Sequence, residues 1–460
     1  MLFNSLQFLL FFIAVTSLYF ALPHKKRWLL LLLASCWFYI AFIPVYIFIL
    51  LFTIAIDYIA GIAIEKNSGR KRKMFLIASI VANIGVLVFF KYFNFFSLNA
   101  GVLLSQFGLN SDMPVLKIIL PIGLSFHTFQ ALSYTIEVYR GNQKAEKHVG
   151  IFALYVLFYP QLVAGPIERP QNMLHQFREV HDFDRQRFRN GILMMSWGIL
   201  KKVVIADHLA LFVDPVYLHP ALYSSSEIIL ATFFFAFQIY FDFSAYSEIA
   251  FGAAYLMGFN LMENFRTPYF SKSVSEFWKR WHISLSTWFR DYLYFPLGGN
   301  RVSRMRVYVN LMIVFLVSGL WHGAQWGFVI WGGLHGAYLV FAQLRDRLFP
   351  KAPSLPVVLQ VIIVFLLSWF AWIFFRAGSL SATKSIFKGI MQGSWSIPHF
   401  NLAEIIFCFL LIVLISAKEY YYNVYQLTVK RNFFPKIIAL AVLIYFFGVF
   451  TENQFIYFQF

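Results

Sequence analysis

The chain has 460 residues, of which 60% are hydrophobic and 13% are charged, and its formal net charge is +17. Soluble domains carry about 25% charged residues, so this composition excludes an ordinary soluble domain and predicts a polytopic membrane protein. The basic residues are scattered between apolar runs and form no DNA- or RNA-binding motif. We therefore expect them to set membrane orientation, and we expect no nucleic-acid partner.

Motifs for several other kinds of chemistry are missing from the sequence. Both cysteines, Cys36 and Cys408, lie inside apolar runs, so we expect neither a disulfide framework nor a zinc site. No set of His, Cys and Asp residues has close ligand spacing, so we expect no metal site and no bound cofactor. Residues 1–21 lack a basic start and a small-residue cleavage site, and predict a first membrane helix rather than a signal peptide.

Apolar runs long enough to span a membrane occur along the whole chain, since a spanning helix needs about 20 apolar residues. They predict helices at 6–22, 28–42, 46–64, 74–90, 118–138, 191–211, 228–240, 357–375, 405–417 and 437–450. Shorter or interrupted runs lie at 149–163, 245–259, 307–320 and 326–342. No soluble domain fits between these runs, so the predicted fold is an all-α bundle in a lipid bilayer.

Clusters of Lys and Arg assign the connecting loops to the two sides of the membrane. The clusters at 25–27, 70–73 and 266–306 should be cytoplasmic, whereas 94–113 and 213–227 lack Lys and Arg and should lie outside. Residues 307–342 then begin and end on the cytoplasmic side and form a hairpin. His322 lies 15 residues into this hairpin, which is roughly 22 Å of helical rise in a hydrocarbon core about 30 Å thick.

An ionisable side chain at such a depth is a functional candidate. Irregular backbone in the membrane is tolerated only where protein or a water-filled cavity surrounds it, so we expect His322 to lie in a pocket. A histidine suits proton or acyl transfer near neutral pH. On spacing alone, a buried histidine that joins two helices by hydrogen bonds is an equally good interpretation. His335 on the following helix is expected to serve packing or hydrogen bonding.

Residues 276–294 are too charged to span the membrane and predict an amphipathic helix in the interface. Its basic side carries Lys279, Arg280 and Arg290, which could meet phosphate groups. His282 lies at the edge of the apolar side, where a catalytic and a structural role are about equally favoured. The segment 296–301 that follows contains Gly298 and Gly299 and predicts a turn with close backbone approach.

Three further polar interruptions are expected to be structural. Asp242 and Glu248 are six residues apart, which does not make them helix neighbours, so paired-carboxylate catalysis fits poorly. We expect these acids to pair with Arg or His or to hydrogen-bond a broken helix. The same structural interpretation is favoured for the segments around His127 and Glu168.

Taken together, three blocks resemble the membrane-bound O-acyltransferase family: residues 241–252, 280–301 and 320–336. Residues 126–141, 162–170, 375–377 and the closing 455–460 are also similar to the family. Among its branches, the chain is most similar to the bacterial group that acetylates alginate and peptidoglycan. Lys279 stands where this group often has an arginine, which is a small change in donor geometry.

The resemblance implies a bundle of roughly 10–12 transmembrane helices around a central tunnel, with re-entrant and interfacial helices. It implies one domain over residues 1–460, with N-terminal helices to 115, a catalytic core at about 116–345 and C-terminal helices from 346. His322 is expected to be the catalytic base or a transient acyl acceptor, and His282 the second family histidine. Expected substrate contacts are Lys279, Arg280, Arg290, Asn300, Arg301 and Trp321.

The implied reaction carries an acetyl group from cytoplasmic acetyl-CoA across the bacterial inner membrane toward a cell-envelope polysaccharide. An extracytoplasmic partner of the SGNH type is expected to complete the transfer to sugar. Three alternatives remain open at this point: D-alanyl transfer for teichoic acid, long-chain acylation of a lipid or protein, and a transporter without acyl turnover.

Overall fold

We analysed a computed structural model that describes residues 1–109, 113–117, 120–351, 353–422, 425, 432–450 and 455–456. Every regular element among these residues is helical, which confirms the predicted all-α class. The chain divides into two compact units. The first consists of Met1–Gly191 with Ala250–Met262, and the second of Ile192–Ile249 with Glu263–Phe460.

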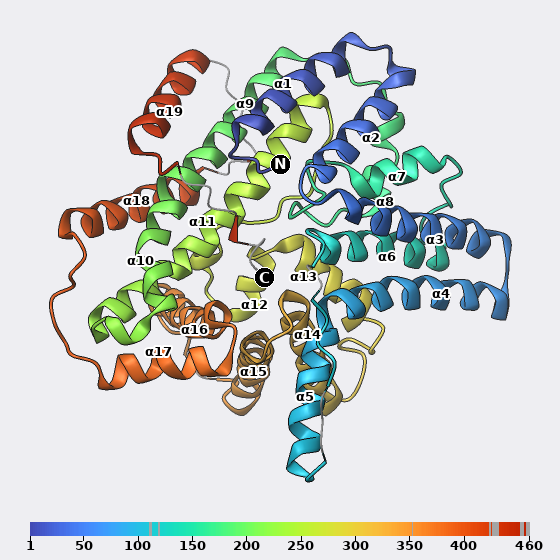
Figure 1. The fold of residues 1–460 in the computed structure, drawn as a ribbon. Helices are drawn as coiled ribbons and strands as arrows, with labels where there is room; N and C mark the ends of the chain where they lie inside the picture. The colour runs from blue at the N-terminus through green and yellow to red at the C-terminus, as the bar shows by residue number, and fades with distance from the viewer. Residues whose placement is uncertain are drawn as a thin grey trace. The chain divides into compact units, whose positions relative to one another are not determined.

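Helices of the first unit come mainly from the N-terminal part of the chain (Figure 1). They are α1 Leu6–Ala21, α2 His24–Ile40, η1 Pro44–Tyr46, α3 Ile47–Lys66, α4 Gly69–Leu87, η2 Val88–Tyr92, α5 Phe93–Gln106, α6 Leu124–Arg140, α7 Val149–Leu157, α8 Pro170–Met173, η3 Gln176–Arg178 and the start of α9 Arg185–Leu200. The nine-residue α7 is too short to cross a bilayer by itself, which agrees with a segment that enters and returns.

Helices of the second unit carry the blocks on which the family resemblance rests. They are η4 Lys201–Ala206, α10 Asp207–Leu218, η5 Pro220–Leu222, most of α11 Ser225–Met257, η6 Pro268–Phe270, α12 Val274–Arg280, α13 Ile283–Phe289, η7 Arg290–Tyr294, α14 Arg304–His322, α15 Trp326–Leu348, α16 Val357–Ala377, α17 Leu380–Gln392, α18 Leu402–Tyr421 and α19 Phe433–Phe447.

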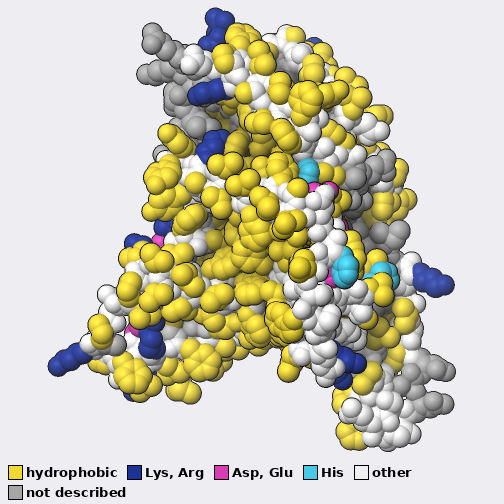
Figure 2. Space-filling view, turned by 90° about the vertical axis from the view of Figure 1, so that its left-hand side faces the viewer, with side chains coloured by type: hydrophobic (Ala, Val, Ile, Leu, Met, Phe, Trp, Pro, Cys, Tyr) yellow, Lys and Arg dark blue, Asp and Glu magenta, His cyan; other side chains and the backbone are white. Residues whose placement is uncertain are grey.

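Six helical stretches among the described residues are long and apolar enough to cross a membrane. They are Pro44–Lys66, Gly69–Gln106, Ser225–Met257, Arg304–His322, Trp326–Leu348 and Val357–Ala377, and two shorter apolar helices are Leu6–Ala21 and Phe433–Phe447. Figure 2 shows a broad hydrophobic face with Lys and Arg mainly around its margins, as expected for a surface that contacts lipid. The protein is therefore a multi-pass membrane protein, whereas the expected total of 10–12 spans stays a prediction.

Three predictions of where helices run were wrong. The run at 228–240 and the run at 245–259 form one continuous helix, α11. The segment after residue 90, expected as an external loop from 94, continues as helix to Gln106 through the π-turn η2. The amphipathic segment 276–294 is broken into α12 and α13, because His282 adopts a left-handed backbone conformation with φ of 42°.

Buried ion pairs explain why α11 runs unbroken through its two acids. The ammonium group of Lys202 lies 2.6 Å from Asp242 and 2.9 Å from Asp207. The ammonium group of Lys201 lies 2.6 Å from Glu248. Both lysines belong to η4, where the helix widens into a π-turn. The expected structural role of Asp242 and Glu248 is thus confirmed, but lysines take the place of the Arg or His that we expected.

The polar interruptions of the first unit are also bonded internally. His127 Nε2 lies 2.5 Å from the Thr53 hydroxyl. Glu168 accepts a hydrogen bond from the Asn172 side chain at 2.7 Å and another from the backbone N–H of Met262. These contacts satisfy His127 Nε2 and the Glu168 carboxylate and agree with the predicted structural roles.

Close packing of α14 against α15 forms the predicted hairpin, with residues 323–325 as its turn. Glycines on both helices make this approach possible. A Cβ on Gly319 would lie 2.2 Å from the Phe328 carbonyl oxygen, and a Cβ on Gly332 would lie 2.1 Å from the Phe315 carbonyl oxygen. Small residues allow membrane helices to pack backbone to backbone in this way.

We predict that Gly332→Ala lowers the stability of the inserted protein, because its new methyl group meets backbone that cannot move aside. Overpacking of this kind costs about 1–3 kcal/mol. Gly333→Ala is the matched control, since a Cβ there meets only Leu316 Cδ2 at 3.6 Å. Thermal unfolding in detergent should show a lower Tm for Gly332→Ala only; equal Tm values for the two variants would contradict the packing.

Candidate functional site

His322 is the last residue of α14, and aromatic side chains enclose it. The helix ends there because Gly323 adopts an extended conformation with φ of −164°, and only 4% of the His322 surface is exposed. The imidazole centroid lies 4.9 Å from Trp321, 5.0 Å from Trp331 and 5.3 Å from Phe375, all at steep interplanar angles. These rings restrict the imidazole and exclude lipid, as expected for a histidine in a protein pocket.

His282 is fully buried at the break between α12 and α13. Its Nδ1 lies 3.1 Å from Asn264 Oδ1, which also accepts the Ser284 backbone N–H at 3.3 Å and the Ser284 hydroxyl at 2.9 Å. The Asn264 amide nitrogen donates to the Ser247 hydroxyl at 3.1 Å. Because the backbone N–H can only donate, the atom facing His282 is an oxygen. The proton of the neutral ring is therefore on Nδ1, and Nε2 is its basic nitrogen.

Burial lowers the pKa of His282 from 6.5 to about 3. The ring is therefore uncharged at neutral pH, because the loss of solvation on burial disfavours the imidazolium. A neutral imidazole with a fixed tautomer can accept a proton at Nε2 or hydrogen-bond a substrate group there. This electrostatic state suits an orienting hydrogen bond at Nε2 better than proton abstraction, since a general base works best with a pKa near the working pH.

One indole ring connects the two histidines. Trp321 lies 4.9 Å from the His322 ring and 6.3 Å from the His282 ring, measured between centroids. The structure therefore brings together three of the residues singled out in the sequence, although they come from α14 and from the break before α13.

A cavity of about 220 Å³ lies beside α12, α13, η7, α14 and α15. Its α14 wall includes Leu311, Phe315 and Ser318. These residues and His322 lie four, three and four residues apart, so they share one side of the helix. Ser318 is one helical turn, about 6 Å, below His322. The cavity thus lies along α14, and its lining comes within one helical turn of His322, which is not itself part of the lining.

Arg290 is the expected basic residue that lines this cavity, and it lies there with Tyr294. Its guanidinium is also paired with Asp291 at 2.8 Å. The other expected substrate contacts lie outside the lining. Arg280 is bound to Glu276 at 2.6 Å, the Asn300 side chain accepts the Tyr294 hydroxyl at 2.5 Å, and Lys279 and Arg301 are exposed on the surface.

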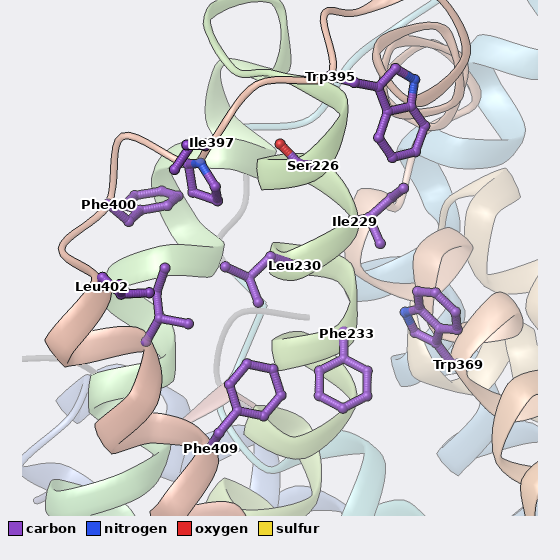
Figure 3. Close-up of a pocket in the computed structure, with 12 residues that line it drawn as sticks. Ser226, Ile229, Leu230, Phe233, Trp369, Trp395, Ile397, Phe400, Leu402 and Phe409 are labelled. Carbon is purple, nitrogen blue, oxygen red and sulfur yellow. The ribbon is translucent and has the colours of Figure 1, made fainter.

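Two larger cavities offer no comparable chemistry. The first, shown in Figure 3, has a volume of about 520 Å³ and an apolar lining in which Ser226 is the polar exception besides the indoles of Trp369 and Trp395. The second has a volume of about 600 Å³ and shares Phe233 with the first. Side chains of α11, α16 and α18 form most of both linings, without a charged group. Such cavities suit lipid chains rather than a reacting group.

Some important side chains carried no recognisable sequence signal. Asn264 holds His282 and Ser284, yet it lies in a loop without a motif. Trp331 contacts His322 from the next helix, and Phe375 contacts it from α16. Phe375 lies in a tract similar to the family, but the tract alone suggested no role. Among the described residues, no group of His, Cys, Asp and Glu could hold a metal ion.

Comparison with known proteins places the sequence in a family. A sequence model described as the membrane-bound O-acyltransferase family matches residues 78–381. The "Probable alginate O-acetylase" of Azotobacter vinelandii is 37% identical over 414 residues, which cover 88% of this chain and 81% of that protein. The "Peptidoglycan O-acetyltransferase" of Helicobacter pylori is 34% identical over 428 residues, which cover 85% of this chain and 80% of that protein.

A more distant relative matches part of the chain. The "Teichoic acid D-alanyltransferase" of Streptococcus thermophilus is 31% identical over 245 residues, or 49% of this chain and 58% of that protein. The family match covers α14, α15 and the segment with His282, so it includes the whole site described above. The chain therefore belongs to the membrane-bound O-acyltransferase family and is a multi-pass membrane acyltransferase.

Proposed function

We propose that this protein is an O-acetyltransferase of the bacterial inner membrane, which takes an acetyl group from acetyl-CoA and passes it toward a cell-envelope polysaccharide. The observation that carries the proposal is the cavity along α14, whose lining residue Ser318 is one helical turn from the buried His322. The names of the alginate and peptidoglycan relatives support the acetyl group and the polysaccharide.

The cavity's size and lining favour a short acyl group. Its volume is about 220 Å³, and Trp278, Phe289 and Phe315 contribute bulky rings to its wall. A long acyl chain needs an extended apolar tunnel, which this cavity does not offer. Arg290 at the lining supplies a cation for the phosphate groups of coenzyme A, because a guanidinium binds phosphate oxygens in a bidentate manner. The thioester end would then lie along the side of α14 that carries Phe315 and Ser318 and point toward His322.

His322 acts as a general base in this proposal. Its imidazole takes the proton of an acceptor hydroxyl as that oxygen attacks the thioester carbonyl carbon. The carbon–sulfur bond then breaks, and the departing thiolate recovers the proton from the imidazolium. Transient acetylation of the imidazole nitrogen is the alternative course, with the same reactants and products. In either course the rings of Trp321, Trp331 and Phe375 limit access of water, which would hydrolyse the thioester.

His282 would act beside this reaction as the second histidine. Its neutral Nε2 is an acceptor for a hydroxyl proton, and Asn264 holds the ring in the tautomer that makes this possible. Asn264 is thus a positioning residue.

In this proposal the donor and the final acceptor lie on opposite sides of the membrane. The polysaccharide lies outside the membrane, whereas acetyl-CoA is made in the cytoplasm, so an extracytoplasmic SGNH-type partner would receive the acetyl group and complete the transfer. Membranes with labelled acetyl-CoA, with and without such a partner, test this directly. Label should pass to the partner or the polymer; uptake of a solute without acyl turnover would favour a transporter instead.

We predict that His322→Ala lowers the rate of acetyl transfer by about 100-fold to 10,000-fold, the range for loss of a general base. The measurement is transfer of labelled acetyl from acetyl-CoA in membranes with equal amounts of each variant. His219→Ala is the control, because His219 is exposed on the surface. Full activity of a stably inserted His322→Ala protein would refute the catalytic assignment.

We predict that Arg290→Ala raises the KM for acetyl-CoA by about tenfold and leaves kcat nearly unchanged, since one charge-assisted contact contributes about 1.5–3 kcal/mol at most. Arg301→Ala is the matched control, because Arg301 is exposed and lies outside the cavity lining. Equal KM values for the two variants would show that the donor does not use this cavity.

We predict that Asn264→Ala lowers kcat with little change in KM, because His282 loses the acceptor that fixes its tautomer. Asn264→Asp should restore part of kcat, since its carboxylate still accepts the Nδ1 proton. The added negative charge also favours the imidazolium and raises the pKa of His282, so the acidic limb of the pH–rate profile should move to higher pH. Equal profiles for Asn264→Asp and the wild type would argue that His282 is purely structural.

A further inference from the structure

A polar cavity of about 290 Å³ lies in the second unit, away from the lining of the cavity along α14. Its lining includes three glutamates and five tyrosines. The glutamates are Glu248 of α11, Glu419 of α18 and Glu263 in the loop before η6. Tyr240 and Tyr425 are among the tyrosines. Such a polar lining differs from the two apolar cavities on the same unit and calls for its own explanation.

One carboxylate oxygen of the three lining glutamates has no hydrogen-bond partner. Glu419 is satisfied, because Oε1 accepts from Lys201 at 2.7 Å and Oε2 accepts from the Tyr240 hydroxyl at 2.6 Å. Glu263 is paired with Arg266. Glu248 Oε1 accepts from Lys201 at 2.6 Å, but Oε2 has no hydrogen-bond partner, although the residue is only 4% exposed. A buried carboxylate oxygen without a partner costs several kcal/mol, so a ligand is the natural complement.

The charge of this cluster indicates the sign of the ligand. Lys201 is bonded to both Glu248 and Glu419, so the directly bonded group contains one cation and two carboxylates. Lys418, the next cation on α18, makes no direct ion pair with them and rests on the Trp197 ring, close enough for its charge to act on both glutamates. Tyrosine rings add the negative faces of their π systems, and their hydroxyls add oxygen ligands. The carboxylate and hydroxyl oxygens of this lining suit a positive ligand that prefers oxygen.

The coordination chemistry narrows the ligand to a monovalent ion. Divalent and transition metals in proteins are usually held by several His, Cys, Asp or Glu side chains. The three glutamates of this lining are not arranged as such a metal-binding group, and none occurs elsewhere among the described residues. One unpartnered carboxylate oxygen, together with neutral hydroxyls and water, matches a single positive charge. The volume of about 290 Å³ leaves room for an ion that keeps part of its water shell.

The cavity lining also connects to His282 through a short loop. Glu263, Phe265, Arg266 and Thr267 line the cavity, and the residue between them, Asn264, binds His282. Tyr425 lines the same cavity, and its hydroxyl lies near the backbone of Asn264. Arg266 N–H donates to the Arg280 carbonyl at 2.9 Å, which joins the loop to α12. A ligand in the cavity would thus stabilise the loop that sets the position of His282.

We propose that this cavity binds a monovalent alkali cation, Na⁺ or K⁺, through Glu248 Oε2 and neighbouring tyrosine hydroxyls, and that the bound cation orders the loop of residues 263–267. The site is separate from the acyl-donor cavity. It does not depend on which acyl group the protein transfers.

The test is direct ion binding to the purified full-length protein in detergent, with radioactive sodium and rubidium ions as probes and N-methylglucamine chloride to hold ionic strength constant. The wild type should bind one ion per chain in a saturable manner. Glu248→Gln removes the charge but keeps an oxygen for Lys201, and should weaken binding by about tenfold or more. Glu404→Gln, an exposed change of equal charge on α18, should bind like the wild type.

Hydrogen exchange gives a second readout in the same buffers. Saturating cation should slow exchange of the Arg266 amide in the wild type and have no effect in Glu248→Gln. Tyr425→Phe removes one hydroxyl and keeps the ring, so it supplies a weaker-binding variant should Glu248→Gln fail to fold. The proposal would be overturned if the wild type showed no saturable binding, or if Glu248→Gln bound the ion as tightly as the wild type. If Glu248→Gln does not fold, unchanged binding by Tyr425→Phe would overturn it.

Discussion

An imidazole can work at membrane depth only where the protein shields it from lipid and satisfies the backbone around it. The hairpin of α14 and α15 meets this requirement through the close approach at Gly319 and Gly332, which brings Trp331 against His322. Phe375 of α16 encloses the ring from another side. The position of His322, the cavity that approaches it along α14 and the turn after it all depend on this one packing arrangement.

Buried ion pairs between η4 and α11 stabilise the charged side chains in the same unit. The two lysines of η4 form ion pairs with the acids of α11. Their charges neutralise the two buried carboxylates, so the helix remains continuous. Removal of one partner from such a pair costs about 3–5 kcal/mol, because the remaining charge stays buried. These pairs therefore hold α11 in the position from which Ser247 reaches Asn264 and, through it, His282.

The sequence was informative where the signal was local. Apolar run length identified most of the helices, and the basic clusters around residues 307–342 predicted the hairpin that carries His322. The sequence failed to predict features that tertiary contacts decide. The break at His282 depends on a left-handed backbone and on Asn264, and the continuity of α11 depends on Lys201 and Lys202, which are distant in sequence.

The closing tract similar to the family lies largely outside the described residues, except for Phe455 and Ile456. Of the residues proposed for substrate contact, Arg290 lines the cavity, whereas the side chains of Arg280 and Asn300 are bonded to neighbours outside it.

The central claim is that the thioester reaches His322 through the cavity along α14. An experimental structure of the protein with a non-reactive thioether analogue of acetyl-CoA tests it most directly. The account predicts the pantetheine arm beside Leu311, Phe315 and Ser318, with the acetyl carbon next to the His322 ring and the phosphates near Arg290. An analogue bound in a different cavity, with its acetyl group far from His322, would contradict the account.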